Sequence, residues 1–178
     1  RHVIDSMFTR KFDAKFLPND QSRELIIYKW SPDMNEITIT FDQSRFDVDA
    51  IHAFLTEAYW CVGIPHEVVR KAIEGSLCIG ALADQQQVGF ARLVTDRATF
   101  AYLADVYVLP GYRGQGLSYR MLNALFDHPD VQGLRRMLLA TRDAHGLYAK
   151  FGFTPLAAPP RFMELHKPDV YHTPNISP

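Results

Sequence analysis

The chain has 178 residues, of which 47% are hydrophobic and 12% aromatic, and its formal net charge is −1. This composition is typical of a globular protein with a sizeable core and excludes a wholly disordered chain. The near-neutral charge argues against nucleic acid or a membrane surface as a partner.

The two cysteines, Cys61 and Cys78, do not form a CxxC pair, so we expect reduced thiols in a reducing compartment. No apolar run reaches the roughly 18 residues that span a membrane, and the first residues lack the apolar region of a secretion signal. These features predict a cytoplasmic protein. The sequence has no HExxH motif or cysteine cluster, so we predict no metal site.

The first regular patterns predict a strand and two helices. Glu24–Trp30 (ELIIYKW) has the composition of a strand, but Glu36–Phe41 alternates more clearly. From Asp47 to Tyr59, apolar residues recur at helical spacing, with Ser44 or Asp47 as the cap. A second helix follows, with Pro65 in its first turn and Gly75 at its end.

The remaining chain predicts a mixed sheet. Three strands joined by short turns must pair antiparallel, and a strand–helix–strand crossover then makes two strands parallel. The predicted segments are strands Ser76–Ala83, Gln87–Thr95 and Thr99–Leu109, helix Gln115–Phe126, a buried strand Arg135–Thr141, helix Ala144–Lys150 closed by Gly152, and a last strand Arg161–His166. The predicted fold class is therefore α+β, with antiparallel strands first, a parallel pair after them, and flanking helices.

The bend between the third of these strands and its helix reads GYRGQG, Gly111–Gly116. Glycines allow the backbone to curl so that N–H groups at a helix N-terminus converge on an anion, and Arg113 adds a positive charge. The bend predicts a phosphate or diphosphate site, although turn geometry alone would also explain the glycines. A Walker loop would end in Gly-Lys-Ser/Thr, and a dinucleotide fingerprint would need glycine where Tyr119 stands.

Two motifs resemble those of the GCN5-related N-acetyltransferase (GNAT) family. Arg113–Ser118 (RGQGLS) matches its acetyl-CoA motif, with serine at the last small position, and Leu147–Phe153 (LYAKFGF) is similar to its second signature. Thr141 stands where the family often has asparagine. The resemblance covers about Glu36–His166. We therefore assign residues 36–178 to a GNAT acetyltransferase domain, and residues 1–35 to an N-terminal extension or an arm added for expression.

The resemblance implies acetyl-CoA as the acyl-donor cosubstrate. It implies that the central strand splays from Arg135–Thr141 and that its backbone pairs with pantetheine. The cofactor-binding residues that it implies are Val106, Val108, Arg113, Gly114, Gln115, Gly116, Leu117 and Ser118.

The catalytic candidates are a proton donor and a proton acceptor. The resemblance places the family's general acid at Tyr148, although a tyrosine that only packs in the core remains the alternative. Asp105 lies in the apolar stretch YLADVYV and is the candidate base. A structural carboxylate is an equally open interpretation of Asp105, and Glu57, Tyr102 and a water chain are its rivals as base.

The sequence thus predicts an N-acetyltransferase in which a primary amine of a small molecule or peptide attacks the thioester directly. The alternative is an acyl-CoA-binding sensor or partner domain without turnover, and Tyr119 disfavours a dinucleotide oxidoreductase. Tyr59, Trp60 and His66 predict an aromatic, mildly polar acceptor surface, and the carboxylates are not clustered as a polyamine site would favour. The expected assembly is a monomer or a homodimer.

Overall fold

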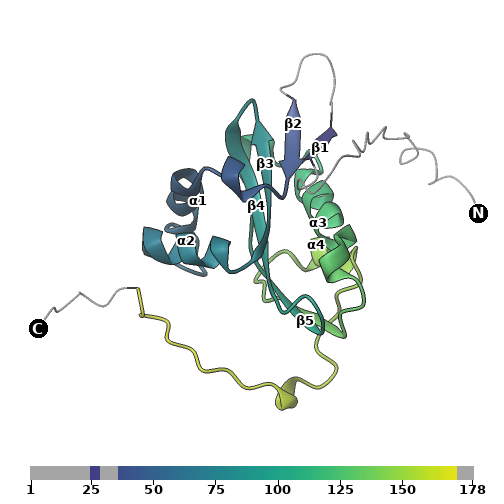
Figure 1. The fold of residues 1–178 in the computed structure, drawn as a ribbon. Helices are drawn as coiled ribbons and strands as arrows, with labels where there is room; N and C mark the ends of the chain where they lie inside the picture. The colour runs from purple at the N-terminus through teal and green to yellow at the C-terminus, as the bar shows by residue number, and fades with distance from the viewer. Residues whose placement is uncertain (1–24, 29–35, 172–178) are drawn as a thin grey trace, which may run out of the picture.

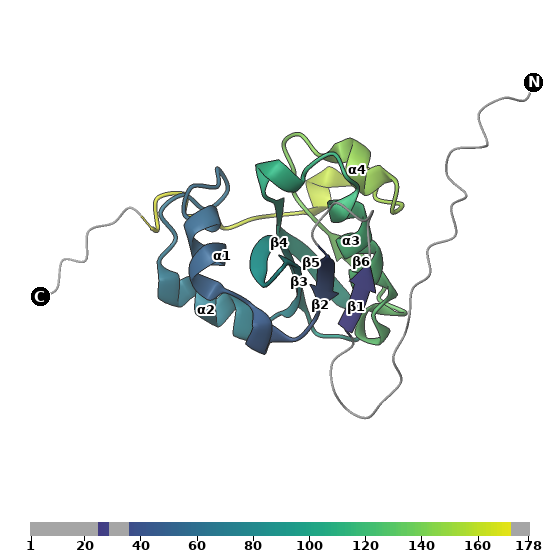
Figure 2. The same cartoon turned by 90° about the horizontal axis from the view of Figure 1, so that it is seen from above.

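The computed structural model describes the backbone of residues 25–28 and the whole of residues 36–171. A six-stranded sheet lies at the centre in the spatial order β1-β2-β3-β4-β5-β6. Helices α1 and α2 cover one face, and α3 and α4 lie on the other (Figures 1 and 2). The strands are β1 (Leu25–Tyr28), β2 (Ile37–Thr40), β3 (Leu77–Ala83), β4 (Gln86–Thr95), β5 (Phe100–Val108) and β6 (Arg136–Leu138), and the helices are α1 (Val48–Leu55), α2 (His66–Glu74), α3 (Leu117–Asp127) and α4 (His145–Ala149).

The pairing of the strands confirms the predicted mixed sheet. Each neighbouring pair from β1 to β5 is antiparallel, and β5 and β6 are parallel. Strand β1 falls inside Glu24–Trp30, so the suggestion of a strand there is confirmed. The rest of the proposed N-terminal extension, residues 1–24 and 29–35, lies outside the described residues.

The sheet separates two hydrophobic cores. Leu122 and Leu125 of α3 pack with Ile79 on one face, whereas Ile51 of α1 and Val69 of α2 pack on the other with Phe90 and Cys78. Every residue of β3 is buried, which explains its continuous apolar sequence. Gly80 in this strand leaves room for a ring, because a Cβ there would lie 2.7 Å from Phe46.

Local capping fixes the first two helices close to where the sequence placed them. The Asp47 carboxylate accepts a hydrogen bond of 2.9 Å from the N–H of Ala50, so Asp47 rather than Ser44 caps α1. Gly75 ends α2 as predicted, whereas Pro65 is the N-cap and lies one residue before the first turn. Helix α1 ends at Leu55, before the predicted Tyr59, because the chain turns where the Gly63 N–H bonds to the Thr56 carbonyl.

Two predictions for the C-terminal third are wrong. The buried strand expected over Arg135–Thr141 pairs only over β6 and is half-exposed, because β6 lies at an edge of the sheet. The strand expected over Arg161–His166 is not formed. A 3-10 turn at Pro159–Arg161 directs the chain away from the sheet, and Met163 and Leu165 are 98% and 91% exposed. Two consecutive prolines at this turn also lack the N–H groups that a sheet ladder needs.

The turn between β4 and β5 is held by the Asp96 carboxylate. It accepts hydrogen bonds from the Thr99 hydroxyl (2.6 Å) and from the backbone N–H groups of Ala98, Thr99 and Phe100 (2.8–3.0 Å). These bonds, that of the Thr99 hydroxyl foremost, hold the pKa of Asp96 well below its usual range. The turn therefore depends on an ionised carboxylate at the residue where the chain enters β5.

We predict that Asp96→Ala lowers the melting temperature at pH 7 and that this difference shrinks as the pH falls below about 4. A depressed folded-state pKa contributes stability above the unfolded-state pKa, and that stability is lost as the carboxylate is protonated. Thermal unfolding followed by circular dichroism at pH 7 and pH 3 measures both effects. Asp96→Asn is the control, since it keeps one oxygen acceptor and should show less pH dependence than wild type. A pH-independent difference for Asp96→Ala would contradict the argument.

Candidate functional site

A cavity of about 950 Å³ opens where β5 and β6 separate. The two strands pair at only three positions, from Phe100↔Arg136 to Tyr102↔Leu138. Beyond them the cavity is lined by residues 103–108 of β5 on one side and residues 140–144 on the other. The splaying expected of the central strand is therefore present, and it exposes backbone groups of β5 to the cavity.

The glycine bend presents backbone N–H groups next to this cavity. Gly114 and Gly116 have φ values of 74° and 72°, in the left-handed region that favours glycine, and Gly116 is the N-cap of α3. No side chain caps this helix, so its first N–H groups remain available. A Cβ built at either glycine meets no heavy atom within 4 Å, which leaves open space above the bend. Such a bend suits a bound anion.

The residues of the predicted cofactor motif contribute unequally. Arg113 and Ser118 line the cavity, as do Val106 and Val108. Leu117 is buried in the core, and the Gln115 side chain donates to the Gly111 carbonyl at 3.4 Å. These two residues, like Gly114 and Gly116, lie outside the cavity lining and offer only main-chain groups.

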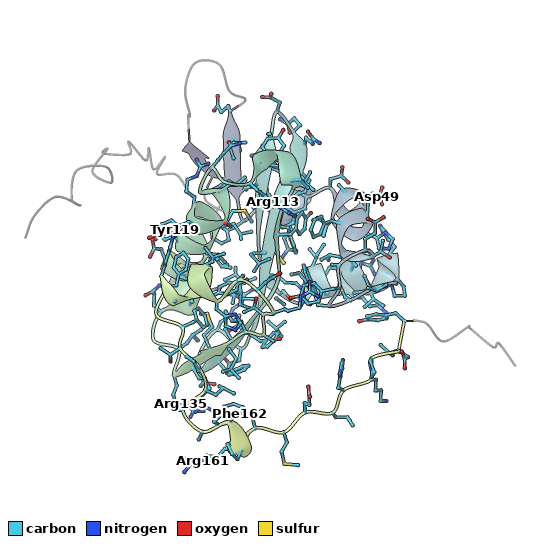
Figure 3. All side chains as sticks on the ribbon, turned by 180° about the vertical axis from the view of Figure 1, so that it is seen from behind. Asp49, Arg113, Tyr119, Arg135, Arg161 and Phe162 are labelled. Carbon is cyan, nitrogen blue, oxygen red and sulfur yellow. The ribbon has the colours of Figure 1, made fainter. Side chains whose placement is uncertain are left out.

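Arg113 brings a positive charge to the end of β5. Its Nε donates a hydrogen bond of 2.8 Å to the Val108 carbonyl, between the bend and the splayed strand (Figure 3). The guanidinium keeps further donors, because arginine carries five N–H groups. An anion held by the bend would therefore lie near a fixed cation.

Tyr148 reaches the cavity from α4. It is buried, packs edge-on against Phe153 at 6.1 Å between ring centroids, and lines the cavity. Burial raises the pKa of its phenol to about 12, and the nearby Tyr59 and Asp143 add to the shift. Tyr148 is thus a protonated group, able to donate, at neutral pH.

Asp105 lies at an irregularity of β5 and is held from two sides. The register shifts between Phe90↔Tyr107 and Arg92↔Ala104, and Asp105 adopts a φ of 55° that is uncommon outside glycine. Its carboxylate accepts from Arg92 Nε at 2.5 Å and from Trp60 Nε1 at 3.0 Å. Arg92 also donates to the Ser76 hydroxyl at 3.3 Å. Asp105 is therefore a structurally fixed carboxylate that faces the cavity.

Aromatic side chains form another part of the cavity lining. Tyr59 and Trp60 stand edge to face at 4.9 Å, and the Arg142 guanidinium lies 3.9 Å from the centroid of the Tyr59 ring. Phe54 stacks on Tyr107 at 3.8 Å. The sequence predicted Tyr59 and Trp60 at this place. We call this part of the cavity the aromatic end.

Other candidates from the sequence lie elsewhere. His66 pairs with Asp49 at 2.8 Å and is not part of the cavity lining. Glu57 is exposed and also outside the lining, whereas Tyr102 belongs to it. At the start of α4 the Thr141 hydroxyl accepts a hydrogen bond of 3.0 Å from the Ala144 N–H.

The sequence reasoning missed Arg92, Arg142 and Tyr171, which all line the cavity. Arg92 had a signal, because it is a lone charge in the apolar stretch QVGFARLVT. Arg142 and Tyr171 had none, since their positions depend on contacts with Tyr59 and with the core beside α1.

Within residues 36–171 the structure shows no group of three or more His, Cys, Asp and Glu side chains that could hold a metal ion. Cys61 and Cys78 are free thiols, and burial raises the pKa of both to about 12. In the same described part of the chain, none of the helices is long and apolar enough to cross a membrane.

Comparisons with known proteins agree with this geometry. The family model described as Acetyltransferase (GNAT) family matches residues 39–153. A crystal structure of a provisional GNAT acetyltransferase from Xanthomonas campestris pv. campestris is 48% identical, with a TM-score of 0.76, over 79% of this chain and 99% of that one. A provisional acetyltransferase of Gibberella zeae, FG08082, is 32% identical over 135 residues, which are 63% of this chain and 75% of that protein.

A more distant structure shares the fold alone. It is a provisional acetyltransferase from Clostridium acetobutylicum solved with acetyl-CoA, 18% identical with a TM-score of 0.51, over 67% of this chain and 90% of that one. The family match covers more than half of the chain. The chain therefore belongs to the GNAT family of acetyltransferases.

We predict that Arg92→Met lowers the free energy of unfolding by about 3 kcal/mol, because it leaves the Asp105 carboxylate without its counter-charge in a mostly buried place. Equilibrium urea unfolding measures this change. Arg70→Met is the matched control, since Arg70 pairs with Glu67 on the exposed surface of α2, and its midpoint should stay near that of wild type. Equal midpoints for the two variants would contradict a stabilising role of the Arg92–Asp105 ion pair.

Proposed function

We propose that this GNAT protein transfers the acetyl group of acetyl-CoA to a primary amine of a small molecule or peptide by direct attack, with Tyr148 as general acid. One observation carries the proposal. Arg113 and Ser118 at the glycine bend, and Tyr148 of α4, line one cavity where β5 and β6 separate. To use acetyl-CoA, this reaction needs two groups from the protein: an anion site for the diphosphate and a proton donor for the departing thiolate.

The residues around the cavity suit acetyl-CoA, which would supply the activated acetyl thioester. Main-chain N–H groups of residues 114–118, with Arg113 beside them, would hold the diphosphate. Backbone groups of Val106 and Val108 lie where β5 has lost its parallel neighbour, and pantetheine amides offer peptide-like partners for them. The distant relative solved with acetyl-CoA supports the choice of this ligand.

Asp105 would accept a hydrogen bond from the acceptor amine and position it. A free amine of the lysine type has a pKa of about 10.4, so only about one molecule in a thousand is neutral at pH 7 and a proton must be removed. Each Asp105 oxygen accepts one bond from the protein, which leaves lone pairs for the N–H of an amine. Arg92 already neutralises this carboxylate. We therefore assign Asp105 to positioning the amine and to relaying the amine's proton to water in the cavity.

Tyr148 would protonate the departing thiolate. General acid catalysis needs a donor that keeps its proton at the working pH, and burial raises the pKa of this phenol to about 12. A pure acyl-CoA-binding domain would need no proton donor in the cavity. Tyr148 therefore favours an enzyme over the alternative of a binding module.

We expect Tyr148→Phe to lower kcat about a hundredfold, the lower range for loss of a general acid, while the KM for acetyl-CoA stays within about twofold. Thiol release from acetyl-CoA with a panel of amines gives both constants. Tyr112→Phe is the control, since Tyr112 belongs to the bend but its half-buried ring packs on the core, outside the cavity lining. An unchanged kcat for Tyr148→Phe would remove this role. Tight CoA binding by wild type without turnover on any amine would favour the binding module.

The pH dependence of kcat gives a second test. The active form of Tyr148 is the protonated one, and its raised pKa means that this form is lost only as the pH rises through about 12. We therefore expect no fall in kcat from the phenol between pH 7 and pH 9.5. An alkaline fall near pH 9 that is present in wild type and absent from Tyr148→Phe would show that the phenol ionises too early for this role.

A further inference from the structure

The chain after the 3-10 turn at Pro159–Arg161 runs from the β6 side of the molecule to the helices on the other face (Figures 1 and 2). We call residues 162–171 the C-terminal strap. At its start the Arg136 guanidinium lies 5.3 Å from the centroid of the Phe162 ring. Figure 3 shows Phe162 and Arg161 at this corner, from which the strap departs. Residues 162–170 are exposed.

Tyr171 ends this exposed run at the cavity. It is half-buried, packs on the core of α1 and α2, as Phe54 and Cys61 also do, and lines the cavity. An exposed segment buries little surface to offset the entropy lost when it is ordered. Burial of the Tyr171 ring against the protein therefore stabilises this end of the strap. Tyr171 thus adds a wall to the aromatic end of the cavity from a distant part of the chain.

The charges at the aromatic end do not suit a polycationic amine. Two carboxylates, Asp105 and Asp143, line the cavity. Asp105 is paired with Arg92, and Arg142, next to Asp143 in the chain, keeps its own positive charge over the Tyr59 ring. A polyamine would bring several ammonium groups to a cavity whose carboxylates do not outnumber its arginines.

The aromatic end suits an apolar or aromatic body instead. Its rings offer large apolar surfaces with polar edges, which bind flat groups by stacking and edge contacts. The aromatic residues that line the cavity are Phe54, Tyr59, Trp60, Tyr102, Tyr107, Tyr148 and Tyr171.

We propose that Tyr171 binds the acceptor and that, with Tyr59 and Trp60, it selects primary amines carrying an aromatic or apolar body over polyamines. The proposal rests on the proposed acetyl transfer for the identity of the acceptor as an amine. It assigns the strap a place in the binding site.

Calorimetric titration of phenethylamine into the CoA-saturated protein tests the binding without turnover. Tyr171→Ala should weaken phenethylamine about tenfold, and Tyr171→Phe should bind it within about twofold of wild type, because the ring is retained. Met163→Ala is the matched control, since Met163 lies in the same strap and is 98% exposed. Circular dichroism melting checks that Tyr171→Ala keeps the wild-type fold, and Tyr171→Leu, which keeps an apolar anchor but no ring, gives an intermediate affinity.

Rates with phenethylamine and spermidine complete the test. Wild type should show at least a tenfold higher kcat/KM for phenethylamine, and Tyr171→Ala should reduce that preference while the KM for acetyl-CoA stays constant. Equal affinity of wild type and Tyr171→Ala for phenethylamine, or a preference of wild type for spermidine, would overturn the proposal. Tight phenethylamine binding that depends on Tyr171, without acetyl transfer, would support the Tyr171 site and contradict the proposed function instead.

Discussion

The early separation of β5 from β6 is the constraint on which the rest of this structure depends. Parallel strands satisfy their backbone groups through their neighbours, and these two do so at only three positions. What remains of β5 faces a cavity instead of a strand. A peptide-like ligand can pair with these backbone groups in place of the missing strand. The exposed edge of β5 can therefore form one side of a binding site. The glycine bend follows shortly after the end of β5, so the same strand leads to both the backbone edge and the proposed anion site.

The contacts of the Asp105 carboxylate connect β5 to β4 and to the loop after α1. The carboxylate joins Arg92 of β4 to Trp60 of the loop after α1, across the irregular register of β5. Separating a mostly buried ion pair of this kind would leave an uncompensated buried charge, which favours keeping these segments together. Its bond to Trp60 ties one ring of the aromatic end to β5. The C-terminal strap adds Tyr171 to that end, so five separate parts of the described chain meet around one cavity.

Features that depend on local chemistry were predictable from the sequence, and those that depend on a tertiary partner were not. The strand pattern of β2, the cap of α1 and the turn at the glycine bend each depend on residues close together in the sequence. The structure has the strand and the bend, and it selects Asp47 over Ser44 as the cap. The Arg161–His166 strand failed because strand composition does not form a strand without an edge that accepts it. Asp105 was found from its apolar surroundings, but its bonds to Arg92 and Trp60 join segments that only the fold brings together.

The central claim is that coenzyme A occupies the space between the splayed strands with its diphosphate on the bend. A crystal structure of the protein with CoA tests this most directly. We expect diphosphate oxygens within hydrogen-bond distance of the N–H groups of residues 114–118, and pantetheine along the backbone of Val106 and Val108. Density for CoA at any other surface, with the bend unchanged and empty, would contradict the account.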